Sequence, residues 1–594
     1  MRAENPPLSP PLELAWLNRE IGRRGLLKSF GTVAAAASLP FLLSSCAGGT
    51  SGGSSNASVD SLTYLASDVP NGFDWDGPNG AVPTTQFGMD QCFGRLVEYK
   101  LVEKNGVLQP DFNQLTGQLA ESWTQEGLDW TFKLRQGVKS PAGNEFTADD
   151  VVWLAERAKA VSGASPIAWF LYNVSSVMGA ENLAPNATAD DKKLKGEVVK
   201  VDKYTVKITQ QKPNKLFPGV LSIFAMSMID STEAKKHTTA SDPYASAWVN
   251  SDAAKTAGYG PYKIVSLQID NSAKFEANPG WNASGLTQPT VKSFTMSKVP
   301  QTSVRVGSLE AGGGTKVTDD LTSRDWKQLS SSKNVKVFSL YGNQNAYVFT
   351  NFKVKPFDNK FLRQALAYAM PYESIASSVY FGTAKRWQGC VPSTYPGYKQ
   401  VATYSENLAK AKDLLAQAGY PNGKGLENFS DALTLYYVAE KQDQLQPLAT
   451  LIQTALKTIG VAIRLSPIPQ SDYGKRQLVT KDLPLAIDDQ EKPIAADAGY
   501  AIQLFFVTGS KGGLNNMMNY SNPQVDDLWL NKAKNEADVD KRNQVLGQIQ
   551  DIIMDDVAWI PLVEWKTQVA GTMNLTDYAY NPDNSIQMAY WKKA

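Results

Sequence analysis

The sequence has very little histidine, and this excludes several kinds of catalytic site. His237 is the only histidine among 594 residues, and it lies in the polar run KKHTT at 235–239. A Ser-His-Asp triad would have to use it, but no apolar neighbours are present to fix its ring, so we interpret His237 as a surface residue. Metal sites built from several histidines are excluded as well. We therefore expect neither a cofactor nor a bound metal.

Two serine-hydrolase patterns occur, but neither has the surroundings that its chemistry needs. Residues 49–53 read GTSGG, a GxSxG pattern, and residues 330–333 read SSSK, an SxxK pattern. A nucleophile elbow needs a strand before it and a helix after it, whereas residues 47–60 are a Gly/Ser-rich spacer, and the SxxK pattern has no SDN or KTG partner. We expect no catalytic residue, and a surface hydrolase is the less favoured alternative.

Neither sign of charge is in excess, and cysteine is scarce. The chain has 59 basic and 58 acidic residues; the first 45 residues hold five basic and three acidic ones, so the remainder carries 54 and 55. The chain therefore has no excess of positive charge of the kind that nucleic-acid-binding proteins carry. Beyond Cys46, the cysteines are Cys92 and Cys390. In an exported protein these two form either one disulfide or two buried free thiols.

The chain lacks a long apolar run after residue 46, where no stretch approaches the roughly 20 apolar residues of a spanning helix. Near its start, Arg23 and Arg24 precede an uncharged run at 29–45, and the run ends in LSSC at 43–46. This order is typical of a twin-arginine export signal followed by a lipidation box. A cleaved signal with an incidental cysteine is the alternative. A lipid on Cys46 would hold the chain on the outer face of a membrane, with residues 46–60 as a flexible tether.

The length predicts two to four domains, since one hydrophobic core does not serve so long a chain. Alternating apolar residues predict strands at 61–65, 129–134, 262–267 and 291–296 and a hairpin at 198–209. Thr147, with Asp150 three positions later, predicts the start of a helix. No repeat of 20 to 50 residues is present, which argues against a solenoid or propeller.

The pattern changes after residue 360, where helical spacing becomes dominant. It predicts helices at 361–370, 408–419, 445–460 and 545–557. Gly419 and Gly460 are the expected ends of two of them, and a strand is expected at 461–465. Helices that alternate with strands in this way predict an α/β unit.

Several short sequence motifs follow one another along the chain. They are LAESW at 119–123, WTFKLRQGVK at 130–139, FTADDVV at 146–152, GYGPYK at 258–263, PFD at 356–358, LRQALAYA at 362–369, YSNPQVD at 520–526 and IPL at 560–562. In order and spacing the chain resembles the extracellular solute-binding proteins of the oligopeptide and dipeptide class, family 5, which feed ABC importers. The motifs themselves are apolar bulk and turns, so they identify a scaffold and not a ligand.

The resemblance implies an α/β fold of two hinged lobes, a three-domain clamshell of the periplasmic-binding-protein type (class II, cluster C). Domain I would take 60–100, 200–340 and 520–594, the inserted domain II 101–199, and domain III, the second lobe, 341–519. The hinge would be crossed near 340–345 and near 509–520, where Gly509, Gly512 and Gly513 give backbone freedom.

The resemblance also implies a function without bond chemistry. The protein would be the lipid-anchored, extracytoplasmic subunit of an ABC importer that captures a peptide or peptide-like solute by lobe closure and delivers it to the permease subunits. Members of the family also bind oligosaccharides, opines, haem or nickel chelates, so a non-peptide ligand is an open alternative, as is a sensor or adhesin. We expect a monomer that meets the membrane only through its lipid.

Candidate ligand-binding residues follow partly from the resemblance. In peptide-binding relatives, an aspartate within the pattern W-x-x-D-Y-x-x-P pairs with the ligand's amine. The matching stretch here is PIAADAGY at 493–500, which puts Asp497 in the place of that aspartate. The stretch lacks the Trp of the pattern, the Tyr after the Asp, and the Pro. The alternative is a loop carboxylate. The other candidates, chosen by position and residue type, are Trp75, Trp387, Tyr473 and Tyr500 as aromatic contacts, Asn351 for a ligand's backbone and Arg386 for a carboxylate. Their alternatives are core burial, a turn cap and an exposed arginine.

Overall fold

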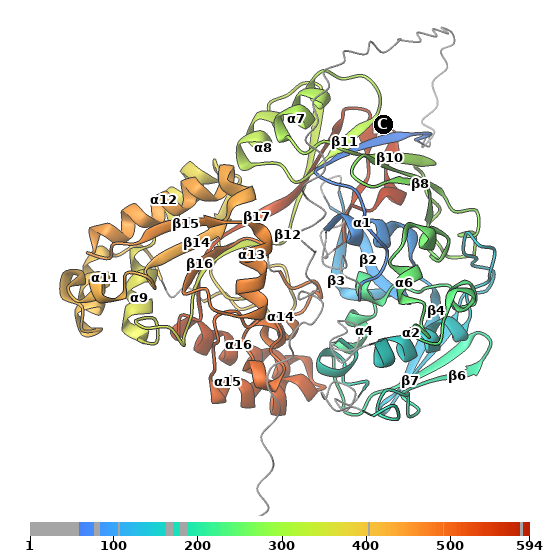
Figure 1. Cartoon of the computed structure of the whole chain (residues 1–594), viewed down its shortest axis with the longest axis horizontal. Coiled ribbons are helices and arrows are strands. Elements are labelled where there is room, and N and C mark those ends of the chain that lie inside the picture. Colours follow the sequence, from blue (N-terminus) through green and yellow to red (C-terminus); the bar gives the residue numbers. More distant parts are fainter. Residues whose placement is uncertain are drawn as a thin grey trace, which may run out of the picture.

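The computed structural model describes residues 59–76, 83–104, 107–161, 170–178, 188–401, 404–490, 492–581 and 586–593. The expected export signal, Cys46 and the GxSxG pattern lie outside these ranges. Figure 1 shows two masses of secondary structure, which are joined by the long strands β12 and β17. In the part of the chain that is described, none of the helices combines the length and the apolar character that a bilayer crossing needs.

One mixed sheet extends through both masses and has eleven strands among the described residues. Its strands follow the order β15-β14-β16-β12-β17-β11-β1-β10-β9-β8, and β13 pairs with β17 beside this path. Their bounds, in chain order, are β1 Leu62–Ala66, β8 Tyr262–Gln268, β9 Ser272–Ala277, β10 Ser293–Lys298, β11 Lys316–Thr318, β12 Val335–Thr350, β13 Ala384–Arg386, β14 Thr434–Val438, β15 Arg464–Ile468, β16 Leu485–Asp488 and β17 Trp559–Thr572.

The antiparallel pair of β12 and β17 contains the point where the chain passes from one mass to the other. The pairing is regular up to Tyr341 opposite Lys566, is then interrupted, and resumes at Asn345 opposite Glu564. We call residues 59–340 and 566–593 the first lobe and residues 346–563 the second lobe. An irregular ladder at this point bends the pair locally, as β-bulges do.

The first lobe joins part of the large sheet to smaller sheets. β1 lies parallel to both β10 and β11, while β8, β9 and β10 are antiparallel. The smaller sheets contain β2 Val97–Lys104, β3 Val107–Gly117 and β19 Tyr578–Ala579; β4 Ala120–Glu126, β5 Asp129–Leu134, β6 Val198–Asp202 and β7 Thr205–Thr209; and β18 Leu575–Thr576 with β20 Lys592–Lys593. Its helices include α1 Pro83–Cys92, α2 Ala148–Val161, α4 Phe217–Val220, α5 Ser231–Ala234, α6 Ser246–Val249, α7 Thr302–Glu310 and α8 Ser323–Leu329.

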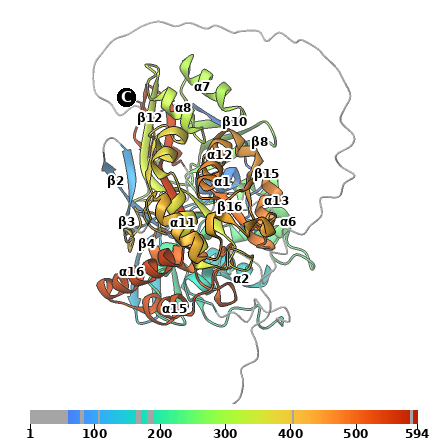
Figure 2. The ribbon, with the colours of Figure 1, turned by 90° about the vertical axis from the view of Figure 1, so that its left-hand side faces the viewer.

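The second lobe contains a parallel βαβ unit, in which α12 connects β14 to β15. β14 also lies parallel to β16, and Figure 2, which looks onto this lobe, shows α11 and α12 on its near side. Its helices include α9 Lys360–Ala369, α10 Tyr372–Ser374, α11 Leu408–Gln417, α12 Gln442–Thr458, α13 Gln470–Gly474, α14 Ala498–Phe505, α15 Pro523–Asp527 and α16 Val539–Asp555.

Most elements predicted from the sequence are confirmed. The start of α2 has the expected cap, because Thr147 Oγ1 accepts from the Asp149 amide at 3.3 Å and Asp150 Oδ2 accepts from the Thr147 amide at 2.8 Å. α11 and α12 end just before Gly419 and Gly460, which have φ of +94° and +91°. The strand expected at 461–465 is instead β15, three residues later, because the chain first turns back to bond the Val461 amide to the Leu456 carbonyl.

The expected division into domains differs from the packing near the C-terminus. Residues 520–563, assigned by the sequence to domain I, pack in the second lobe: Arg363 Nε donates to the Asp556 carbonyl at 3.0 Å, and Tyr404 Oη donates to the Met554 carbonyl at 3.0 Å. The chain therefore returns to the first lobe along β17, near Glu564, and not at the glycines of 509–520. The first expected crossing, at 340–345, coincides with the irregular part of β12. The other domain boundaries stay a prediction.

Candidate ligand-binding site

The parallel strands of both lobes end at the same place, the junction between the lobes. In the first lobe, β11 ends at Thr318 and runs antiparallel to β17, so its carboxyl end points along β17 toward Lys566. In the second lobe, β16 ends at Asp488 and runs antiparallel to β12, so its carboxyl end points along β12 toward Asn345. Ligands of α/β proteins bind outside the carboxyl ends of parallel strands. The junction is therefore the candidate ligand-binding site.

The first lobe brings polar and charged side chains to this junction. Asp319 and Asp320 directly follow β11. Tyr64 of β1 donates its hydroxyl to Asp319 Oδ1 at 2.7 Å, and Arg305 of α7 donates to the main-chain carbonyl of Asp320 at 2.8 Å. Burial, together with the neighbouring Asp320 carboxylate, raises the pKa of Asp319 to about 6.

The second lobe adds charges of both signs. Asp489 follows β16 and Lys441 follows β14, and Lys441 Nζ lies 3.1 Å from Asp489 Oδ1. Asp488 accepts hydrogen bonds from Gln477 Nε2 and, at 2.7 Å, from the Gln490 amide. Burial opposes the charged form of Lys441, but Asp489 and Asp320 outweigh it and raise the pKa of Lys441. Because Asp320 belongs to the first lobe, charges of the two lobes are within electrostatic reach of each other.

Aromatic rings lie where the chain passes between the lobes. Trp565 of β17 is stacked with Tyr380, with ring centres 5.5 Å apart and planes at 27°. Lys492 Nζ lies 5.5 Å from the centre of the Trp565 ring and donates to Gln344 Oε1, in the irregular part of β12. Burial lowers the pKa of Lys492 to about 8.

Two aromatic pairs join the lobes directly. Phe170, in the π-helix Phe170–Val174 of the first lobe, is stacked on Tyr500 of α14 at 6.2 Å. Phe112 of β3 meets Tyr395 of the second lobe edge-on at 5.4 Å. The lobes are thus in contact in this structure.

The structure gives Asp497 a role within the second lobe. Its carboxylate accepts from Arg542 Nη1 at 3.0 Å and Nη2 at 2.7 Å, and from the Gly499 amide at 2.6 Å, which makes it the N-cap of α14. Asp497 is therefore a helix cap and an ion-pair partner, and not the simple loop carboxylate that was the alternative. Both carboxylate oxygens already accept hydrogen bonds from Arg542. That Asp497 meets a ligand amine stays a prediction.

Three of the aromatic candidates are buried. Trp387 is 1% exposed and donates Nε1 to the Val391 carbonyl at 3.0 Å. Tyr473 is fully buried and donates to the Ile487 carbonyl at 2.7 Å, next to the end of β16. Tyr500 lies in the contact with Phe170. Trp75 is half-buried against the core of the first lobe. Trp387 and Tyr473 are therefore core residues, which was the alternative to ligand contact, whereas Tyr500 lies at the boundary between the lobes.

Asn351 caps a turn, and Arg386 packs on an aromatic ring. Asn351 directly follows β12, at the edge of the sheet where β16 begins. Its side-chain Nδ2 donates to the Lys481 carbonyl at 2.9 Å, and its Oδ1 accepts from the Lys353 amide at 3.1 Å. These bonds are those of a turn cap, which was the alternative to ligand binding. The Arg386 guanidinium lies 4.3 Å from the centre of the Tyr372 ring. Their roles toward a ligand stay predictions.

The possible disulfide is not formed, since Cys92 and Cys390 are free and buried. Cys92 packs in the core beside Phe93, and Cys390 in the core of the second lobe beside Trp387. His237, as expected, is a partly exposed residue, stacked on Trp248 at 4.3 Å. Within the described ranges, no group of three or more His, Cys, Asp or Glu side chains could hold a metal ion.

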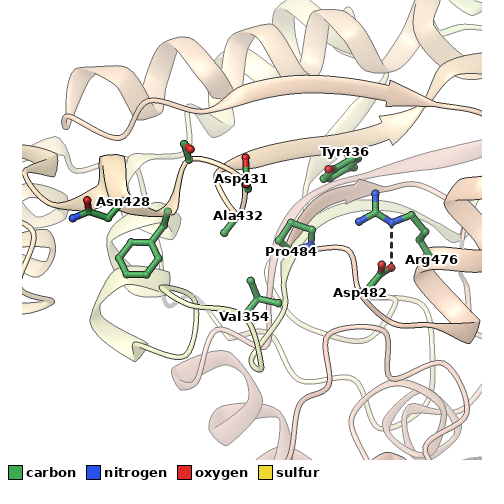
Figure 3. Close-up of a pocket in the computed structure, with 10 residues that line it drawn as sticks. Val354, Asn428, Asp431, Ala432, Tyr436, Arg476, Asp482 and Pro484 are labelled. Carbon is green, nitrogen blue, oxygen red and sulfur yellow. Dashed lines mark hydrogen bonds and ion pairs between the residues drawn. The ribbon is translucent and has the colours of Figure 1, made fainter.

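A separate hollow of about 460 Å³ lies in the second lobe, away from the junction (Figure 3). Arg476 and Asp482 form an ion pair at 3.1 Å at its wall, and the Arg476 guanidinium lies 4.6 Å from the centre of the Tyr436 ring. It lies at the amino-terminal edge of β14 and β16, since Ala432 and Pro484 line it. We therefore do not assign the ligand-binding site to this hollow.

The sequence interpretation missed Asp319, Asp320, Asp488, Asp489, Lys441 and Lys492. A signal for two of them was present, because Asp488 and Asp489 come directly after the buried strand residues 485–487. The strand itself was not predicted, so its end could not be recognised. The others come from loops whose proximity depends on the fold.

The chain belongs to the bacterial extracellular solute-binding proteins of family 5, since a sequence model of the middle region of this family matches residues 114–511. It has the two-lobed α/β clamshell of these periplasmic binding proteins. The family is one of extracytoplasmic binding proteins and not of enzymes.

Particular relatives are similar along most of the chain. Heme-binding protein A of Haemophilus influenzae is 27% identical over 90% of this chain and 93% of its own length. The glutathione-binding protein GsiB of Escherichia coli K12 is 26% identical over 80% of this chain and 85% of its own length. The dipeptide-binding protein of Pseudoalteromonas sp. SM9913, solved in complex with Met-Leu, has a TM-score of 0.72 and 20% identity, over 90% of this chain and all of that one.

Proposed function

We propose that this protein is the lipid-anchored, extracytoplasmic substrate-binding subunit of an ABC importer. It captures a peptide or peptide-like solute between its lobes and delivers it, unchanged, to the permease subunits. The family and the names of the relatives, which bind glutathione, haem or a dipeptide, support a small organic solute.

The observation that most supports this proposal is the convergence of parallel strand ends from both lobes on one charged junction. Asp319 and Asp320 come from the first lobe, and Lys441, Asp489 and Lys492 come from the second. A solute that carries both an amine and a carboxylate can interact with both kinds of charge. An uncharged oligosaccharide cannot, so the junction favours a peptide-like solute over that alternative.

Capture depends on lobe closure. A solute at the junction touches groups of both lobes only when the lobes are together, so it binds the closed state more tightly than the open one and shifts the population toward it. The contacts of Phe170 with Tyr500 and of Phe112 with Tyr395 join the two lobes in this structure, so separation of the lobes would break them, and they stabilise the closed state. The permease then distinguishes loaded from empty protein by shape.

Native mass spectrometry of protein purified without refolding tests the ligand class. We expect retained masses that correspond to peptides or amino-acid conjugates, and small-angle scattering should show compaction when such solutes are added back to stripped protein. No binding and no compaction over a broad panel of peptides would contradict the proposal.

The anchor is tested separately in the producing cell. Replacing Arg23 and Arg24 together by Lys should stop export, since twin-arginine signals depend on the arginine pair. Cys46→Ala should leave export intact but release the protein from the membrane fraction. An unchanged membrane fraction for Cys46→Ala would contradict lipid anchoring while leaving solute binding unaffected.

A further inference from the structure

Lys492 has an ammonium group at the lobe junction that forms no ion pair with a carboxylate of the described ranges. Among the described residues, its contacts are with the neutral amide of Gln344 and the ring of Trp565. It is only partly exposed. A half-buried cation that has lost part of its water needs an anion, and a neutral amide replaces that water incompletely.

Several neighbouring carboxylates already have partners. Asp489 is paired with Lys441 at 3.1 Å, and Asp319 accepts from Tyr64 at 2.7 Å. Asp488 accepts from Gln477 and from a main-chain amide. Asp497, farther along the same segment, is held by Arg542. Of the two lysines, Lys441 has a carboxylate partner in Asp489, whereas Lys492 has no direct counter-charge within the described chain.

A second donor, the Tyr380 hydroxyl, belongs to a ring that is stacked on the same Trp565 side chain. The hydroxyl of Tyr380, whose ring is stacked on Trp565, has no hydrogen-bond partner among the described residues, although the side chain is 2% exposed. A buried hydroxyl without a partner costs on the order of 1 to 3 kcal/mol. Beside the Trp565 ring, the Lys492 ammonium therefore has only a neutral acceptor, and the Tyr380 hydroxyl has none among the described residues.

We propose that Lys492, beside Trp565 and Gln344 at the lobe junction, binds an acidic group of the transported solute. The solute is therefore an acid, such as a peptide with a free carboxylate or a side-chain carboxylate, and Lys492 distinguishes it from the blocked or neutral analogue. This inference rests on the proposed function in that the solute enters between the lobes. It adds the charge that the solute must carry.

The protonation of Lys492 agrees with this assignment. Burial and the neighbouring Lys441 lower the pKa of Lys492, whereas Asp489, Asp488 and Asp320 raise it, and the result is about 8. The three neighbouring carboxylates thus do not fully offset the lowering of the Lys492 pKa by burial. A solute carboxylate in direct contact would, because an adjacent opposite charge favours the charged form. Binding should therefore weaken from pH 7 to pH 9, as free Lys492 loses its proton.

The test compares matched pairs of probes on the full mature protein. The probes are a library of two- to five-residue peptides with free carboxylates, the same library with every terminal and side-chain carboxylate converted to an amide, and oligosaccharides that contain uronic acids beside their neutral counterparts. The variants are Lys492→Met, Lys492→Arg, Tyr380→Phe and, as a control, Lys566→Met. Lys566 is the next residue after Trp565, contacts the ring of Tyr341 at 5.5 Å and lines a hollow on the other face of β17. Affinities are measured by native mass spectrometry and calorimetry at pH 7 and pH 9.

We expect acids to bind wild-type protein more tightly than their blocked partners. Lys492→Met should weaken the acids by roughly 10- to 100-fold, as expected for a charge-assisted hydrogen bond, and leave the blocked probes unchanged. Lys492→Arg should retain part of the preference, Tyr380→Phe should lose less than Lys492→Met, and Lys566→Met should behave as wild type. The ratio of wild-type to Lys492→Met affinity should fall between pH 7 and pH 9.

Each result decides the inference. If acids and blocked probes bind wild-type protein equally, or if Lys492→Met weakens both equally, the inference is overturned while peptide binding stands. If peptides fail and uronic acids bind through Lys492, the inference holds and the peptide proposal is overturned. If no acid of either class binds, both are overturned.

Discussion

The guanidinium of Arg542 holds the carboxylate of Asp497 through two hydrogen bonds, of 3.0 Å from Nη1 and 2.7 Å from Nη2. Arg542 comes from α16, and Asp497 is the cap of α14, so the pair fixes one helix of the second lobe against another. The side chains are 7% and 22% exposed, respectively. An aspartate placed by its motif in a ligand-binding position is thus engaged in holding the scaffold.

Asp497→Asn is therefore expected to lower stability. The change removes the charge opposite a nearly buried arginine, and we expect a loss of roughly 2 kcal/mol in the free energy of unfolding, below the 3 to 5 typical of fully buried pairs because Asp497 is partly exposed. Urea unfolding measures it, and a cycle with Arg542→Gln isolates the coupling of the pair. Unchanged unfolding together with weakened peptide binding would restore the amine-binding role.

The same example shows what the sequence could and could not predict. Local patterns predicted α2 from Thr147 and Asp150, and α12 from its apolar stripe, because capping and helical spacing are properties of neighbouring residues. The family motifs predicted the clamshell. Arg542 and Asp497 are 45 residues apart, and no local pattern reports that α14 and α16 meet.

The ligand site was largely beyond sequence reasoning for the same reason. Asp319, Lys441 and Lys492 follow strands or loops of different lobes, and they become neighbours only when β12 and β17 join the two halves of the sheet. The buried run of β16 is only four residues long, too short to be separated from a loop by its periodicity. The candidates chosen by residue type were large aromatics, and such residues are most often core, as Trp387 is.

Asp319 makes stability depend on pH. Burial raises the pKa of Asp319 from its ordinary 3.8 to about 6, so the folded protein holds this proton more tightly than the unfolded chain. The stabilisation is fully present below about pH 4 and is lost as the pH rises through about 6. Asp319→Asn, which keeps an acceptor for the Tyr64 hydroxyl, should be more stable than wild type above pH 6, by at most about 3 kcal/mol, and equal to it below pH 4.

Thermal unfolding of the two proteins between pH 3.5 and pH 8 measures this difference. Asp320→Asn is the matched control, because the Asp320 carboxylate contributes to the raised pKa of Asp319, and removing it should reduce the pH dependence without abolishing it. A difference between wild type and Asp319→Asn that is constant over this range would refute the explanation.

The two buried cysteines should be unreactive in the folded protein. Cys92 and Cys390 are 3% and 1% exposed, and burial raises the pKa of both thiols, so little thiolate is present at neutral pH. In a chain with Cys46 replaced by Ala, a thiol reagent should label neither cysteine natively and both after unfolding. An unfolded, unreduced chain that yields no free thiol would instead demonstrate the disulfide that the structure lacks.

Removal of the Phe170 ring should favour the open state. Phe170 and Tyr500 are stacked across the lobe boundary with planes at 17°, and such a pair contributes about 0.5 to 1.5 kcal/mol to the state in which it forms. Because the open state lacks this contact, Phe170→Ala should shift the unliganded population toward it and weaken the apparent affinity for a retained solute by roughly 2- to 10-fold. Small-angle scattering of the stripped variant should give a larger radius of gyration than that of stripped wild-type protein.

Phe361→Ala is the control, since Phe361 is 44% exposed on α9 and takes part in neither aromatic pair that joins the lobes. If the scattering and the affinity of Phe170→Ala both equal those of the control, the stacked pair does not contribute to closure, and the charges of the junction alone must hold the lobes together.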